Sequence, residues 1–244
     1  MQNLAPKLSS NAIKLIAIAA MTIDHIAWLL FPGYSREALP LVMHAVGRIT
    51  CPIMCWFIAE GYHYTRNINK YTARLFLFAL ISHVPYMLMF GEGETLPFTN
   101  GSILNQTSVM WSLAWGLVML RIADSEKIKK EWHRDLLIVL VCLISLPADW
   151  SCIASLCILA IGTNRGNFKV QMRWMLLYMT MYSLVYMLTI DVLYGVLQMA
   201  VALSIPILKQ YNGQRGKNRS INTAMKWLFY IYYPLHLLII AVIR

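Results

Sequence analysis

Charged residues are scarce in this chain of 244 residues. They make up 13% of it, against about a quarter in a typical soluble domain. Hydrophobic residues make up 59%, and they gather in long runs instead of being scattered as in a soluble core. The chain also lacks any repeat of solenoid length or low-complexity stretch, and its longest polar connections are "RIADSEKIKKEWHR" and "KQYNGQRGKNRS". Little is left for a soluble domain, so we expect one all-α integral membrane domain over residues 1–244.

A spacing of His and Cys residues that would bind zinc is also missing. The five cysteines all lie in or near apolar runs, and Cys51 and Cys55 are one helical turn apart. We therefore expect buried thiols and no metal site.

Long apolar segments are the main feature that is present. A membrane-spanning helix needs roughly 20 mostly apolar residues. Two neighbouring pairs share the short hinges "LPADW" and "LTIDV", so each pair is either a tight hairpin or one broken span, and the count lies between eight and ten. The nine candidate segments are 12–31, 38–63, 72–90, 102–120, 135–148, 149–163, 171–188, 191–208 and 223–242.

Basic residues outnumber acidic residues by 21 to 11. Such an excess can indicate nucleic-acid binding, but the positions of these residues favour membrane topology. If the N-terminus is cytoplasmic, every second connection carries nearly all of them, with Arg36, Arg48 and Arg244 as the exceptions. This alternation predicts nine membrane-spanning helices, a cytoplasmic N-terminus and no nucleic-acid partner. The basic face would also attract anionic membrane lipids or a phosphorylated cofactor.

Several ionisable residues interrupt the apolar segments. Each costs roughly 2.5–3.5 kcal/mol at a helix centre, so such residues normally face the bundle interior and pair with one another. Asp24 and His25 lie in the outer half of the first segment, and Arg48 and His236 lie at similar depth. Neighbouring residues of a helix point about 100° apart, so Asp24 needs a partner from another helix. We predict an Asp24–Arg48 ion pair, which is either part of a site or a structural salt bridge.

The histidines differ in what their positions indicate. An imidazole can act as a general base near neutral pH, although a lone membrane histidine is more often a packing residue. Because His25 adjoins Asp24 and lies at the depth of His236, we expect a functional role for it. His44 and His83 are expected to be mainly structural.

A basic rim follows the second segment. Glu60 lies near the end of that segment, and Arg66, Lys70, Tyr71 and Arg74 follow it. These residues could anchor an ordinary loop at the membrane surface. They could also bind the phosphates of a nucleotide-like cofactor that enters from the cytoplasm. Spacing alone does not decide between the two interpretations.

The order of the polar motifs resembles a known family. The motifs are "AMTIDHIAWLLF", "VGRITCPIMCWFIAEGYHYTRNINKYTARLFLFALISHVPY", "GSILNQTSVMW", "PADWSCIASL" and "FYIYYPLHLLII". In this order and spacing they resemble the TraX family, whose namesake is an F-pilin acetylase, and the resemblance covers nearly the whole chain. The residues that match the motifs are Asp24, His25, Gly47, Arg48, Pro52, Glu60, Gly61, Arg74, Asn105 and His236. Cys51 stands where the family often has an aromatic residue, and Trp150-Ser151 stand where it often has Tyr-Gly.

The resemblance implies a transmembrane acyltransferase of the bacterial cytoplasmic (inner) membrane. Such an enzyme would move an acetyl group from cytoplasmic acetyl-CoA to an amine or hydroxyl of an extracytoplasmic protein, glycan or lipid. His25, or else His236, would accept the proton of the acceptor. Arg48, beside Asp24, or the imidazole that is not used as the base, would stabilise the developing oxyanion. Asn105, among the residues carried over, is also expected to bind the cofactor.

Two other classes of function compete with this interpretation. Asp, His and Arg within spans are equally typical of the proton relay of a transporter or permease. Against a transporter, the sequence has no visible repeat between its halves and no matched pair of broken helices. A membrane scaffold is the third possibility, but it would not need several ionisable groups at similar depth.

The charge alternation makes a testable prediction about topology. It places the loop 121–134 in the cytoplasm and the hinge at Asp149 outside. In a variant without native cysteines, a cysteine at position 128 should resist a membrane-impermeant thiol reagent in intact cells, and one at position 149 should react. Labelling of position 128 from outside would contradict the nine-span arrangement.

Overall fold

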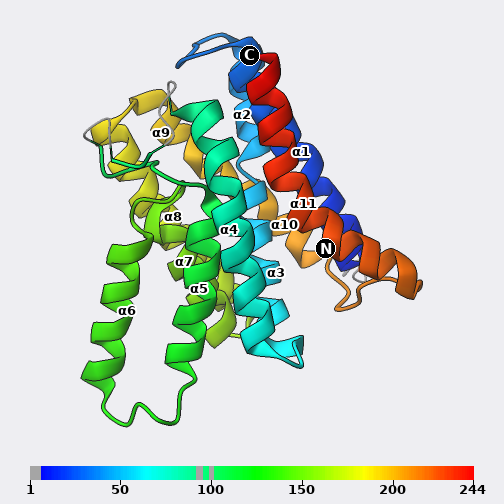
Figure 1. Ribbon diagram of the computed structural model, residues 1–244, viewed down its shortest axis with the longest axis vertical. Coiled ribbons are helices and arrows are strands. Elements are labelled where there is room, and N and C mark those ends of the chain that lie inside the picture. Colours follow the sequence, from blue (N-terminus) through cyan, green and yellow to red (C-terminus); the bar gives the residue numbers. More distant parts are fainter. Residues whose placement is uncertain (1–6, 92–95, 99–101) are drawn as a thin grey trace. The chain divides into compact units, whose positions relative to one another are not determined.

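All regular elements in the described part of the chain are helices. The computed structural model describes residues 7–91, 96–98 and 102–244 (Figure 1). The expected all-α fold class is confirmed for these residues. In chain order, the elements are α1 (Ser10–Leu30), α2 (Ala38–Gly47), α3 (Thr50–Tyr64), α4 (Ile68–Phe90), α5 (Val109–Ala123), α6 (Glu131–Ser145), α7 (Ser151–Thr163), α8 (Phe168–Thr189), α9 (Val192–Leu197), the 3-10 helix η1 (Gln198–Leu203), α10 (Ser204–Lys209) and α11 (Arg219–Ile243).

Each predicted apolar segment overlaps one helix or one run of short helices, but the predicted segment 102–120 begins too early, because residues 102–108 are not helical and α5 begins at Val109. Five of these runs are long and apolar enough to cross a membrane: Ser10–Leu30, Ala38–Tyr64, Ile68–Phe90, Val192–Lys209 and Arg219–Ile243. Two shorter apolar helices, α5 and α7, accompany them. The membrane character of the chain is thus supported, whereas the count of nine spans and the side of the N-terminus stay predictions.

The outward surface of α4 agrees with a membrane environment. Leu77, Leu80, Ile81 and Val84 lie on this helix and are between 46% and 64% exposed. A helix that turns so many large apolar side chains outward would be a liability in water, whereas lipid tails accommodate it.

The chain divides into two compact units. The first consists of Met1–Met54 and Met179–Tyr233, and the second of Cys55–Tyr178 and Pro234–Arg244. The first unit therefore contains α1, α2, α9, η1 and α10, and the second contains α4 to α7. The expectation of a single domain stays a prediction.

Two apolar runs of the first unit are interrupted where the sequence predicted continuous spans. The run 38–63 is divided at Arg48 and Ile49, between α2 and α3. Pro52 has no N–H group, so the Arg48 carbonyl four residues earlier loses its helical partner. Likewise the run 191–208 contains η1 at its centre, and Pro206 removes the helical partner of Ala202. Prolines therefore loosen both helices near their middle.

The second unit is built around close packing of α5 against α7. Leu113 and Leu117 of α5 and Ala154 and Ile158 of α7 are fully buried. Gly116 allows this approach, since an added Cβ would lie 2.6 Å from the Ile158 Cδ1 atom and 3.0 Å from the Ser155 Cα atom. Helices α4 and α5 lie side by side in the same unit (Figure 1).

We predict that Gly116→Ala lowers the melting temperature. Alanine normally stabilises a helix interior by roughly 0.5–1 kcal/mol relative to glycine. Here we expect the substitution to be destabilising instead, because overpacking typically costs about 1–3 kcal/mol. Adding Ile158→Val removes the nearest methyl group and should restore part of the loss. A Gly116→Ala protein as stable as the wild type, by thermal unfolding in detergent, would mean that α5 and α7 are not held this closely.

Candidate active site

The first unit places the Asp24 carboxylate inside the contact between α1 and α2. Asp24 is only 8% exposed although it lies in the middle of an apolar helix. Gly47 on α2 makes room for it, because a Cβ at that position would lie 2.3 Å from the Asp24 Cβ atom. The Thr50 hydroxyl also donates to the Ala17 carbonyl at 3.2 Å, which ties the start of α3 to α1.

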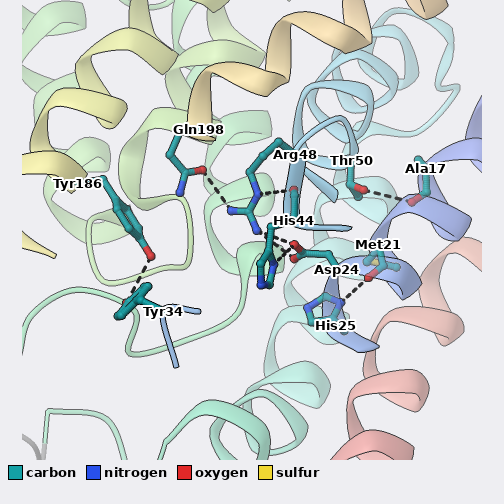
Figure 2. A network of polar contacts seen from close by, with 10 residues as sticks. All are labelled: Ala17, Met21, Asp24, His25, Tyr34, His44, Arg48, Thr50, Tyr186 and Gln198. Carbon is teal, nitrogen blue, oxygen red and sulfur yellow. Dashed lines mark hydrogen bonds and ion pairs between the residues drawn. The ribbon is translucent and has the colours of Figure 1, made fainter. Parts of the chain in front are cut away.

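Two donors meet this carboxylate, one from α2 and one from the residue that follows it (Figure 2). The Nδ1 atom of His44 lies 2.8 Å from Asp24 Oδ1, and the Nη2 atom of Arg48 lies 2.8 Å from Oδ1 and 3.0 Å from Oδ2. His44 and Arg48 are four residues apart, so they share one face of the chain. The predicted Asp24–Arg48 ion pair is thus confirmed. Figure 2 shows the three side chains converging.

Arg48 continues the network toward η1. Its Nη1 atom donates to the Gln198 Oε1 atom at 3.1 Å, and its Nε atom donates to the His44 carbonyl at 3.3 Å. Gln198 is 2% exposed. The two interrupted runs of the first unit therefore meet through Arg48 and Gln198, each next to its own interruption. This pair of broken helices removes one argument that the sequence offered against a transporter.

Aromatic rings surround the His44 imidazole. The ring centroids of Trp28 and Tyr194 lie 4.6 Å and 5.4 Å from that of His44, and Tyr34 packs edge-on against both. His44 is completely buried. Its Nε2 atom is also inaccessible and has no hydrogen-bond partner among the described residues. One nitrogen of the imidazole is thus hydrogen-bonded to a carboxylate, and the other has no hydrogen-bond partner among the described residues.

His25 and His236 are the two histidines for which the sequence predicted a catalytic role. The Nδ1 atom of His25 bonds the Met21 carbonyl of its own helix at 2.8 Å, and Figure 2 shows the ring turned toward that carbonyl. The Asp24 carboxylate bonds His44 and Arg48. His236 is buried and belongs to the second unit. The catalytic roles expected for His25 and His236 stay predictions.

The predicted cofactor rim lies in the second unit, around the α3–α4 turn. Glu60 forms an ion pair with Arg165, and the Glu60 Oε1 atom lies 3.5 Å from the Arg165 Nε atom. Arg66 and Lys70 are exposed, whereas Tyr71 is buried against Gly61. The name α3–α4 rim is used below for Glu60, Arg66, Lys70, Tyr71 and Arg74.

Arg74 is the member of the α3–α4 rim with an unmet donor. Its Nε atom is buried and has no hydrogen-bond partner among the described residues, and its guanidinium carbon lies 5.8 Å from the centre of the Tyr71 ring. A buried guanidinium donor without an acceptor fits an anionic ligand such as a phosphate.

Asn105 is not brought to the α3–α4 rim. Arg121, at the end of α5, donates to Asn69 and Thr72 near the start of α4. The residues just before α5 lie further along α4 instead, since the Thr107 hydroxyl is 3.0 Å from the His83 Nδ1 atom. Helices α4 and α5 run antiparallel, so Asn105 lies toward the opposite end from Arg74. One phosphate group could not contact both residues.

The sequence interpretation missed His44 and Gln198. A usable signal existed for His44, because its spacing of four residues from Arg48 puts both on one helical face. Gln198 carried a weaker signal, as a polar residue inside an apolar run.

The fold and cluster define a class: helical membrane proteins with a buried acid–imidazole–guanidinium network. The family profile described as "TraX protein" matches residues 9–244, so the chain belongs to the TraX family. It is 26% identical over 243 residues to "Probable fimbrial assembly protein FimC, serogroup H1" of Dichelobacter nodosus, covering 96% of this chain and 94% of that one. It is also 26% identical over 126 residues to "Uncharacterized protein RP591" of Rickettsia prowazekii (strain Madrid E), covering 44% and 48%. No solved structure gives a significant match.

We predict that Asp24→Ala destabilises the protein by about 3–5 kcal/mol, since it leaves the Arg48 guanidinium, whose side chain is only 14% exposed, without its counter-charge. Combining Asp24→Ala with Arg48→Leu should recover most of that stability, although the His44 Nδ1 donor stays unsatisfied. Thermal unfolding in detergent of the wild type, both single variants and the double variant measures the coupling between the two residues. A double variant no more stable than Asp24→Ala would show that the ion pair does not hold α1 to α2.

Proposed function

We propose that this protein is a membrane-embedded acyltransferase. It transfers an acetyl group from cytoplasmic acetyl-CoA to an amine or hydroxyl of an extracytoplasmic acceptor, such as a pilin N-terminus or a cell-surface glycan or lipid. Membership of the TraX family supports this proposal, as does the relative named as a probable fimbrial assembly protein. The protein would be a multi-pass component of the bacterial inner membrane.

The observation that carries the proposal is the Asp24 carboxylate, buried in α1 and bonded to both the His44 imidazole and the Arg48 guanidinium. Acyl transfer to an amine or hydroxyl needs a group that accepts the proton of the nucleophile and a positive group near the developing oxyanion. An imidazole and a guanidinium at one buried carboxylate supply both kinds of group. A membrane scaffold would have no use for such a costly arrangement.

The α3–α4 rim supports acetyl-CoA as the donor substrate. The unmet Nε donor of Arg74 and the exposed side chains of Arg66 and Lys70 offer positive charge for the phosphates of coenzyme A. The Glu60 carboxylate, held by Arg165, does not neutralise Arg74.

A transporter remains the second candidate function. Its support is the meeting of two interrupted runs at Arg48 and Gln198, because many transporters place their substrate site at broken helices. A transporter would carry protons or solutes across vesicles without acetyl-CoA, and a transferase would not.

The test of the proposed function is transfer of label. Purified protein in lipid vesicles is incubated with acetyl-labelled acetyl-CoA and with separated envelope fractions of protein, glycan and lipid. We expect one fraction to gain the label, and only when the protein is present. Absence of label in every fraction, together with proton or solute flux in the same vesicles, would favour the transporter.

We predict that the double variant Arg74→Ala with Lys70→Ala binds acetyl-CoA more weakly than the wild type. The difference should grow as salt is lowered, because attraction between exposed charges is screened by ions. Titration calorimetry at two or more salt concentrations measures it. The matched control is Lys127→Ala with Lys129→Ala, which removes the same charge from exposed positions elsewhere. If both double variants bind like the wild type, the phosphates bind outside the α3–α4 rim.

A further inference from the structure

The protonation of His44 follows from its partner. The Nδ1 atom lies 2.8 Å from the Asp24 Oδ1 atom, and a carboxylate with Arg48 beside it accepts hydrogen bonds. The Nδ1 atom therefore carries the hydrogen, and in a neutral imidazole the lone pair is on Nε2. This is the arrangement in which a carboxylate orients a histidine so that its far nitrogen can accept a proton.

The Nε2 atom has no structural role to justify its burial. It is inaccessible and has no hydrogen-bond partner among the described residues. A buried polar atom left without a partner typically costs about 1–3 kcal/mol. The bond to Asp24 uses Nδ1 alone, so packing gains nothing from a second nitrogen. A ligand atom that reaches Nε2 in the working protein accounts for its presence.

A carboxylate and aromatic side chains surround the His44 ring. The groups that contact it are the Asp24 carboxylate, to which Arg48 is also bonded, and the aromatic side chains of Trp28 and Tyr194. Tyr34 is the exposed member of this aromatic cluster, at 44%, and packs edge-on against Trp28 and Tyr194.

We propose that His44, through its Nε2 atom, is the catalytic residue that accepts the proton of the acyl acceptor. The inference rests on the proposed function and deepens it. The amine or hydroxyl of the acceptor approaches past Tyr34 and donates its proton to Nε2 while its nitrogen or oxygen attacks the thioester carbonyl. A new C–N or C–O bond forms and the C–S bond breaks. The imidazolium then returns the proton to the leaving thiolate of coenzyme A, so no other reactant is needed.

The test separates the two nitrogens of His44. In His44→Asn the side-chain amide can still donate to Asp24 from the place of Nδ1, whereas Nε2 is absent. We expect a folded protein that binds acetyl-CoA like the wild type and transfers label about 10²–10⁴-fold more slowly. His44→Gln, whose amide nitrogen replaces Nε2 without accepting a proton, should be equally slow. If one of these two variants does not fold, the other still tests the role of Nε2.

His83→Asn is the matched control. His83 also uses Nδ1, in a contact with the Thr107 hydroxyl, and lies in the second unit. It should transfer label at close to the wild-type rate, which shows that the substitution itself is tolerated.

Three outcomes overturn parts of the account in distinguishable ways. A wild type that transfers no label refutes the proposed function, and the role of His44 with it. A wild type and a folded His44→Asn that transfer equally well refute only the role of His44. If in addition a folded His25→Asn is inactive, the proton acceptor is His25, as the sequence first suggested.

Discussion

The structure of the first unit depends on neutralising one carboxylate in an apolar helix. Asp24 is buried in α1, where an uncompensated charge would be unstable. His44 and Arg48 supply hydrogen bonds from the same face of α2, and they reach Asp24 because Gly47, between them, has no side chain. The need for these contacts fixes the register of α1 against α2 more narrowly than apolar packing could, since apolar surfaces can slide at little cost.

The contact between Arg48 and Gln198 lies where two helices are interrupted. Pro52 ends the regular hydrogen bonding at Arg48, and Pro206 does the same at Ala202, close to Gln198. Irregular backbone within a membrane is tolerated where it is buried in protein or lines a cavity. The two breaks meet at the Arg48–Gln198 contact, so a polar side chain at each break bonds a polar side chain at the other.

The sequence predicted the helices well because long apolar runs and their polar hinges are local signals. It also predicted the Asp24–Arg48 pair, since opposite charges at similar depth in neighbouring segments have few other partners. It did not predict the breaks at Arg48 and at η1, although Pro52 and Pro206 were visible, because proline within a membrane helix often causes only a kink. It also missed His44, because rotation about the α2 axis decides which histidine meets Asp24, and composition does not encode that rotation. Asn105 shows a further limit of prediction from sequence, since a shared family motif does not tell near which end of α4 a residue lies.

The way in which protons can reach His44 favours one class of function over its rival. A histidine in a relay accepts a proton on one nitrogen and releases it from the other, so both nitrogens need exchangeable partners. In His44 the Nδ1 hydrogen is held by Asp24, whose carboxylate is also bonded by Arg48, and Arg48 is a permanent cation that cannot pass a proton on. In the proposed role, protons would enter and leave through Nε2 alone. A general base needs this arrangement, because it takes a proton from the attacking group and returns it to the leaving group on the same side. A relay would have to break the Asp24–Arg48 pair on every cycle, against a cost of several kcal/mol.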